Sequence, residues 1–338
     1  MGTTILIFVF GALFGLILQY AGLNRYNTIS GQALLKDNTV VKTILLTIGL
    51  GAILFSITTG LGLSNFHVKP FVTGGLVLGG LIFGAGMAIL GYCPGTLAVS
   101  LGEGSGDALV GIIGGLFGGI AYTLALPSIK GILGPDLGKL SLYSLFNGYS
   151  FLYFITVAII GMLIIYAAFF IHLKEKSVDK KWIVSGVALA VLDVIVFLTF
   201  TTNRPIGAST GYPWLADLIA GLTNNAYFAK IKTPGAWEGI FLLGTIVAAF
   251  IYSLAKGEFK PVMVHSNWKK YKNNSAVSRA AWAFFGGFIL IFGARMAGGC
   301  TSGHIISGGM QLAFSSFVFG IFMFTGLVIT GKLFYKTR

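Results

Sequence analysis

The sequence predicts an all-α integral membrane protein, and its composition is the first reason. Hydrophobic residues make up 55% of the 338 residues and charged residues only 10%, and the mean hydropathy is +0.87. A soluble domain has about a quarter of its residues charged. The 49 glycines are about twice the usual frequency, which suits close helix packing within a bilayer. Together these observations exclude an ordinary cytosolic enzyme.

The second reason is a series of apolar runs, each near the roughly 20 residues that a transmembrane helix needs. The first run has no basic region before it and further spans after it, so we expect a retained helix rather than a cleaved signal peptide. About nine spans are predicted, together with short re-entrant or broken helices. The spans lie near residues 5–21, 41–61, 71–90, 107–126, 150–172, 182–201, 236–255, 279–297 and 312–331.

The basic residues indicate an orientation. Lysines gather in the loop 173–181 and again in the loop 256–272, and loops rich in Lys and Arg stay on the cytoplasmic side. Nine alternating spans then place the N-terminus outside and the C-terminus in the cytoplasm, in the inner (cytoplasmic) membrane of the cell. This topology explains the net charge of +13 better than nucleic-acid binding does.

An internal repeat runs through the chain. Residues 83–88 (FGAGMA) are echoed by residues 292–297 (FGARMA), and each copy leads to a glycine-flanked cysteine, Cys93 or Cys300. Asn24-Arg25 is likewise echoed by Asn203-Arg204. Chance similarity in a Gly- and Ala-rich sequence is the alternative.

The repeat predicts two halves of opposite orientation. Five expected spans separate each element from its echo, and an odd number inverts the second copy in the membrane. We expect a first half at 1–172, a cytoplasmic basic linker at 173–181 and a second half at 182–338.

Each cysteine lies where a hydrophobic helix is interrupted. Residues 91–96 (GYCPGT) contain a proline and two glycines, and residues 298–304 (GGCTSGH) contain glycines and hydroxyls. Such breaks free backbone groups that lipid cannot satisfy, so they face protein or a water-filled cavity. A helix that restarts after the cysteine would attract anions at its N-terminus and favour the thiolate. The alternative is that each cysteine is a small buried hydrophobe.

Each of the other polar residues in or near the spans allows two interpretations of its role. His304, four residues after Cys300, is either a thiol partner or an ordinary hydrogen-bonded histidine. Arg25, Arg204 and Arg295 lie at span ends, where they form a vestibule for an anion or extend to the membrane interface. Asp193 lies inside an apolar run, and we favour a structural role for it over a proton path.

The sequence contains no motif for several classes of functional site. The two cysteines are more than 200 residues apart and belong to no CxxC, which gives neither a disulfide framework nor a zinc site. There is no Walker A sequence and no Ser/His/Asp arrangement. We therefore expect no metal, no cofactor and no enzymatic activity.

The cysteine segments resemble the YeeE/YedE family of sulfur-compound transporters, which includes thiosulfate uptake proteins. The resemblance rests on residues 83–96, 292–309 and 18–23 and covers nearly the whole chain. It implies an hourglass of membrane spans and re-entrant helices, in which cysteines at a constriction hydrogen-bond the terminal sulfur of a passing anion. It also implies a cytosolic sulfur-carrier or rhodanese-like partner. The candidate translocation residues are Cys93, Cys300, Pro94, Gly95, Thr96, Thr301, Ser302, His304, Asn24, Arg204 and Arg295.

One departure from the family leaves the substrate open. Thiosulfate-transporting members typically have a third cysteine in the first re-entrant segment, and residues 22–31 contain none. Either two thiols suffice, or Asn24 substitutes, or the substrate differs, for example a selenium species. A general solute channel with incidental cysteines is a further alternative. So is a membrane thiol oxidoreductase, whose disulfide would need the two Cα atoms within about 7 Å.

Overall fold

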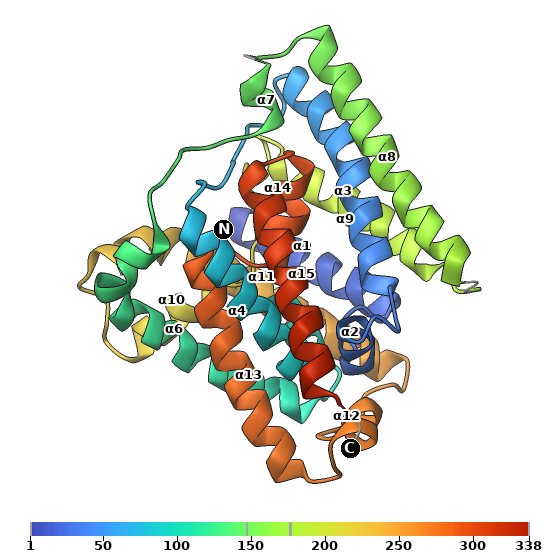
Figure 1. Ribbon diagram of the computed structural model, residues 1–338, viewed down its shortest axis with the longest axis vertical. Helices are drawn as coiled ribbons and strands as arrows, with labels where there is room; N and C mark the ends of the chain where they lie inside the picture. The colour runs from blue at the N-terminus through green and yellow to red at the C-terminus, as the bar shows by residue number, and fades with distance from the viewer. Residues whose placement is uncertain (1, 147, 176–177, 337–338) are drawn as a thin grey trace.

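The computed structural model describes residues 2–146, 148–175 and 178–336, and every named element in these ranges is helical (Figure 1). Residues 176–177 of the predicted linker lie outside the described residues. Eight helical segments are long and apolar enough to cross a membrane, which confirms a multi-pass helical architecture. Six of these segments are α1 (Gly2–Tyr20), α3 (Thr39–Gly60), α6 (Gly106–Leu133), α8 (Phe151–Glu175), α11 (Ala226–Ala255) and α15 (Phe314–Phe334).

The other two segments are broken helices. In the first, α4 (Thr73–Leu90) is followed by α5 (Pro94–Gly102). In the second, α13 (Ala276–Met296) is followed by the π-helical turn η1 (Thr301–Ile306) and by α14 (Ser307–Met310). The cysteines lie between the pieces, so the predicted breaks and helix restarts are confirmed.

The sixth predicted span, near 182–201, is shorter than expected. It corresponds to α9 (Lys181–Phe197), whose 17 residues make about 25 Å of helix, less than the roughly 30 Å hydrocarbon core. The helix stops because Leu198 adopts an extended backbone and forms an antiparallel bridge with Ser64. The Thr199 N–H then donates to the Leu63 carbonyl at 2.8 Å. The prediction of nine spans is thus corrected to eight for the described residues.

Four short helices complete the chain. Two of them, α2 (Tyr26–Ala33) and α10 (Gly211–Ile219), follow the repeated Asn-Arg pairs, and neither is long enough to cross a bilayer. α2 packs against α3 and α15, and α10 packs against α11 and α6. The others, α7 (Leu142–Leu145) and α12 (Ser266–Tyr271), lie in connections between the longer helices.

Helix packing follows the same pattern in the two parts of the chain. α1 packs against α11, and α9 packs against α3. α4 packs against α15, and α13 packs against α6. α4 and α13 also pack against each other near the centre of the molecule (Figure 1). The two broken helices therefore lie side by side.

Two glycines of the repeated FGA segments permit this close packing. A Cβ on Gly84 would lie 2.0 Å from the Met323 carbonyl oxygen of α15, and one on Gly293 would lie 2.5 Å from the Phe83 nitrogen of α4. Both distances are shorter than any real contact, so a side chain at either position would force the helices apart.

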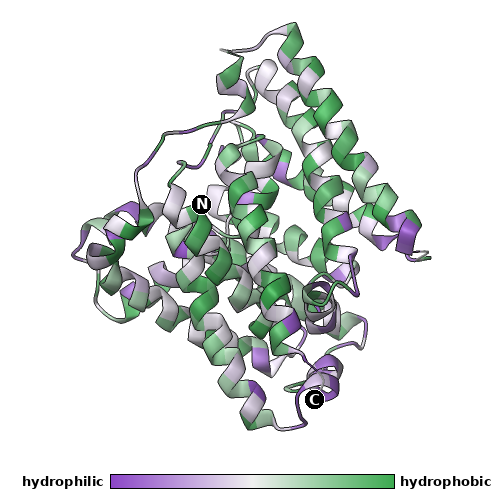
Figure 2. Ribbon diagram, in the orientation of Figure 1, coloured by the Kyte–Doolittle hydropathy of each residue, from purple (hydrophilic) through white to green (hydrophobic). Residues whose placement is uncertain are grey.

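Figure 2 shows hydrophobic residues along the long helices and hydrophilic ones mainly near helix ends and loops.

Candidate functional site

Both breaks begin with a glycine in the left-handed region. Gly91 has φ of +80° and Gly298 has φ of +74°, and each lies two residues before a cysteine. Glycine adopts this conformation without the steric cost that a Cβ would add, and it commonly ends helices. The chain therefore leaves α4 and α13 in the same manner and reaches the two cysteines in equivalent positions.

Cys93 caps the start of α5. Its backbone is extended, its N–H donates to Thr96 Oγ1 at 2.7 Å, and the Thr96 hydroxyl lies 3.3 Å from Cys93 Sγ as a donor. Pro94 occupies the first helical position, which suits its fixed φ and missing N–H. Cys93 retains part of its exposure, while Tyr92, Pro94 and the rest of α5 around it are largely buried.

Cys300 occupies the corresponding place before η1. Its backbone is also extended, and its Sγ lies 3.2 Å from Ser302 Oγ. The side chain is buried, with 1% of its surface exposed. Both cysteines are free thiols, and each thus has a hydroxyl partner two or three residues later.

Tyr212 of α10 links the two breaks. Its hydroxyl donates to the Pro94 carbonyl at 2.9 Å, and both Cys93 and Cys300 act electrostatically on it. Gly95 packs close to the Phe14 ring of α1, which a Cβ at position 95 would meet at 3.2 Å. The segments that carry the two cysteines are therefore neighbours around α10.

A basic cavity of about 160 Å³ reaches Cys300. Arg204 and Arg295, two of the predicted candidates, line it together with that cysteine. A wider cavity of about 680 Å³ adjoins it and shares Lys69, Lys230 and Arg295. We call the smaller one the basic vestibule; its charged lining is Lys69, Arg204, Lys230, Glu238 and Arg295.

Lys69 extends from the α3–α4 loop to the second break. Its Nζ donates to the Gly298 carbonyl at 2.8 Å. It also lies 2.9 Å from the position that a Cβ on Gly299 would take, so a side chain there would displace it. Burial lowers the pKa of Lys69, and the nearby Glu238 carboxylate partly offsets this effect. The hydrogen bond to Gly298 holds the Lys69 amino group in the basic vestibule, which Cys300 also lines.

Glu238 of α11 occupies the N-terminus of α10. Its Oε2 accepts hydrogen bonds from the backbone N–H groups of Thr210 and Gly211, the latter at 3.2 Å. The positive end of this short helix is thus already paired with a carboxylate. Among the charged residues of the basic vestibule, four are cations and Glu238 is the single anion.

The two arginines of the basic vestibule are held differently. Arg295 donates to the Tyr227 hydroxyl at 2.8 Å and to Thr210 Oγ1 at 3.0 Å. Arg204 packs over the Trp237 ring, 4.5 Å from its centre, and its Nε has no hydrogen-bond partner among the described residues. Burial lowers the pKa of Arg204 from the usual arginine value. An unpartnered guanidinium N–H is well suited to bind an anion.

Two of the sequence candidates have structural contacts instead. His304 Nε2 bonds to the Ala297 carbonyl at 2.9 Å, its Nδ1 lies 3.3 Å from Ser316 Oγ, and its ring stacks on Phe319. Neither ring nitrogen is bonded to the Cys300 thiol, in agreement with the ordinary hydrogen-bonded histidine. Asp193 accepts from Ser307 at 2.8 Å and so ties α9 to α14.

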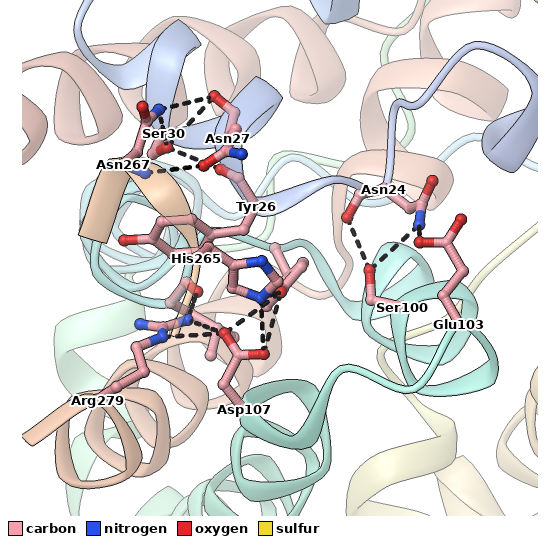
Figure 3. Close-up of polar contacts among 12 residues, drawn as sticks. Asn24, Tyr26, Asn27, Ser30, Ser100, Glu103, Asp107, His265, Asn267 and Arg279 are labelled. Carbon is pink, nitrogen blue, oxygen red and sulfur yellow. Dashed lines mark hydrogen bonds and ion pairs between the residues drawn. The ribbon is translucent and has the colours of Figure 1, made fainter. Parts of the chain in front are cut away.

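Asn24 lies apart from the basic vestibule. Its amide nitrogen donates to Glu103 and Ser100 (Figure 3). These two partners line a separate pocket of about 330 Å³ that also includes Arg25 and His265. Thr301 is buried within η1 and lines neither cavity.

Sequence reasoning missed three residues of the site: Lys69, Glu238 and Tyr212. Glu238 carried a usable signal, because a carboxylate inside an apolar run is costly and marks a functional or paired group. Lys69 had none, because a lysine in a loop between spans is ordinary. Only the fold places it against the second break.

Comparison with known proteins agrees with this geometry. The profile of the sulphur transport family matches residues 26–329. The chain is also similar to the thiosulfate transporter TsuA of Spirochaeta thermophila, with 28% identity over 332 residues, covering 94% of each chain. The match contains both cysteine breaks, α10 and the basic vestibule. The chain therefore belongs to the sulphur transport family of membrane transporters.

Proposed function

We propose that this protein takes up a small sulfur-containing anion, thiosulfate being the leading candidate, through a constriction at Cys93 and Cys300. The observation that carries the proposal is the matched pair of helix breaks, each with a thiol at the start of a short helix. The relative named as a thiosulfate transporter supports the same substrate.

The basic vestibule supplies the attraction for the anion. Its four cations outnumber its one carboxylate, and charges of one sign in a low-dielectric cavity raise the local concentration of the opposite ion. A sulfonate-like group would be held by the unpartnered Arg204 Nε and by Lys69. The anion would arrive there next to Cys300.

The thiols then bind the terminal sulfur. Because the Thr96 hydroxyl donates to Cys93 Sγ, the Cys93 S–H hydrogen is left free to donate elsewhere. A thiol is a weak donor that holds a sulfur atom without trapping it. Passage requires binding that is favourable enough to enter and weak enough to leave, and two thiols in succession meet both requirements.

We also propose that residues 1–172 and 182–338 form two inverted halves in the cell inner membrane. The matched packing of α1 with α11 and of α9 with α3 supports this assignment. The basic loops 173–181 and 256–272 both stay in the cytoplasm only if α9 crosses in addition to the eight long segments, and we propose that it does so where the bilayer is locally thinned. The N-terminus is then outside and the basic vestibule faces outward. Reporter fusions at both termini test this orientation, and a C-terminal reporter active outside the cell would contradict it.

The decisive experiment is uptake of radiolabelled thiosulfate into proteoliposomes that contain the full chain. Cys93→Ala and Cys300→Ala, each at matched protein content, should lose most uptake, since each removes one of two successive sulfur-binding groups. Ser56→Ala is the control. It also shortens a buried side chain to alanine, in this case on α3, and should keep thiosulfate uptake. Uptake that is indifferent to both cysteine variants would overturn the thiol mechanism, and absent wild-type uptake would overturn thiosulfate as the substrate.

A further inference from the structure

A polar cluster joins α1, α5 and the loop before α2. Asn24 Nδ2 donates to Glu103 Oε2 at 2.7 Å and to Ser100 Oγ at 3.3 Å, and Ser100 Oγ donates to the Asn24 carbonyl at 2.7 Å (Figure 3). Gln19, near the end of α1, acts on the Glu103 carboxyl from close by. We call these four residues the Asn24 cluster.

The Asn24 cluster contains buried polar atoms without partners. Asn24 is fully buried and Gln19 is 4% exposed. Asn24 Oδ1 and both polar atoms of the Gln19 amide have no hydrogen-bond partner among the described residues. Leaving such groups unpaired is costly, so these atoms are available to hydrogen-bond water or a solute.

The Asn24 cluster lies along α5 from the first cysteine. Cys93 caps the start of α5 and Ser100 lies seven positions later, on the same helix face and about 10 Å farther along the axis. Ser100 and Glu103 line the 330 Å³ pocket. The Asn24 cluster therefore lies between Cys93 and that pocket.

We propose that the Asn24–Glu103 hydrogen bond is a gate on a path from Cys93 to this pocket, closed while Glu103 is a carboxylate and open once Glu103 takes up a proton. This inference rests on the proposed function. A carboxylate beside a narrow path repels an anion, and a neutral carboxyl group does not. Protonation also weakens the Asn24–Glu103 hydrogen bond, because the bond loses its charge assistance. The Asn24 amide N–H is then more easily drawn to the oxygens of a passing anion.

The surroundings of Glu103 suit a proton-controlled group. Burial raises the pKa of Glu103, so Glu103 takes up a proton at a higher pH than an exposed glutamate does. The Asn24 and Gln19 amides and the Arg25 guanidinium lower this pKa, and the Glu258 carboxylate raises it further. The remaining titratable groups of the pocket are Tyr26, Lys260 and His265, and the Lys260 backbone N–H donates to the Glu103 carbonyl at 3.2 Å.

Access of a membrane-impermeant methanethiosulfonate reagent to Cys93 tests the gate without any transport substrate. The chain has two cysteines, so Cys300→Ser leaves Cys93 as the single thiol. In that background the reagent is added on the pocket side at one fixed neutral pH. Cys93 should then be labelled about tenfold faster in Glu103→Gln, because this variant lacks one charge-assisted hydrogen bond. Asn24→Ala should also label faster.

Glu258→Gln is the matched control, because Glu258 lines the same pocket but makes no hydrogen bond to Asn24. It should label at the background rate. Equal labelling of Glu103→Gln and Glu258→Gln, both shown by gel filtration to be folded, would overturn the gate. If Glu103→Gln does not fold, Asn24→Ala decides in the same way.

Uptake measurements separate this inference from the proposed function. Wild-type uptake should rise as the pH on the pocket side falls, and Glu103→Gln should lose that dependence. Absent wild-type thiosulfate uptake would count against the proposed substrate and leave the labelling result as the test of the gate. A pH dependence in Glu103→Gln equal to that of the wild type would contradict the gate directly.

Discussion

Lys69 Nζ donates a hydrogen bond of 2.8 Å to the carbonyl oxygen of Gly298. This bond joins a loop between two spans to the end of α13, where unpaired carbonyls carry partial negative charge. An ammonium group at that point cancels the negative charge next to Cys300. The route to this thiol is thereby kept attractive to anions.

Replacement of Lys69 should weaken anion binding. We expect Lys69→Met to raise the KM for thiosulfate by about tenfold, because one charge-assisted contact to the anion is lost. Lys232→Met is the control, since Lys232 is exposed on α11 and lines neither outer cavity. Both values come from initial uptake rates in proteoliposomes. A KM for Lys69→Met equal to that of Lys232→Met would show that Lys69 does not bind the substrate.

The charge on Lys69 also predicts a pH dependence on the vestibule side. Burial lowers the pKa of Lys69, so its positive charge is complete below that pKa and is lost as the pH rises through it, earlier than for an exposed lysine. Uptake should therefore fall when only the vestibule-side pH is made alkaline. Lys69→Arg should resist this fall, because arginine stays protonated. An identical alkaline decline in both proteins would assign the effect to another group.

The buried pair of Asp107 and Arg279 should be essential for the first break. Arg279 Nε donates to Asp107 Oδ2 at 2.9 Å, and its other nitrogens bond to the Ile89 and Leu90 carbonyls at the end of α4 (Figure 3). Asp107→Asn leaves a buried guanidinium without its counter-ion. We expect a loss of about 3–5 kcal/mol, the usual result of breaking a buried pair.

The matched variant is the double change Asp107→Asn with Arg279→Gln, which removes both charges together. It should recover part of the lost stability, because no unpaired charge remains. Thermal unfolding midpoints in one detergent measure both variants. Equal midpoints for the double and the single variant would mean that the charges are not coupled.

Close helix packing predicts a sharp contrast between two glycines. Gly84→Ala places a Cβ 2.0 Å from the Met323 carbonyl, and overpacking of this kind costs about 1–3 kcal/mol. Gly131 of α6 has nothing within 4 Å of a built Cβ, so Gly131→Ala should be neutral or stabilise by up to about 1 kcal/mol. Unfolding midpoints of the two variants compare directly. A stable Gly84→Ala protein would mean that α4 and α15 can separate at no cost.

Much of the fold was predictable from the sequence, because the bilayer imposes a strong pattern. Apolar runs of span length identified all the long helices, and the Gly and Pro residues next to Cys93 and Cys300 identified both breaks. The end of α9 was not predictable. It depends on the pairing of Leu198 with Ser64, a contact over more than 130 positions that no local pattern reveals.

The site was only partly predictable for the same reason. Arg204 and Arg295 were identified from their positions at span ends, and the structure places both beside Cys300. Lys69 and Tyr212 reach the breaks only through tertiary packing. Asn24 was expected among the translocation residues, as one alternative to a third cysteine. Its hydrogen bonds place it by a pocket separate from the basic vestibule.

The carboxylate of Glu238 at the start of α10 has a kinetic consequence. A bare helix N-terminus surrounded by four cations would hold an anion in a deep energy well, and its slow departure would limit turnover. Because Glu238 already satisfies the N–H groups of Thr210 and Gly211, the well is shallower. If the protein carries an anion as proposed, this arrangement favours rapid passage over tight capture.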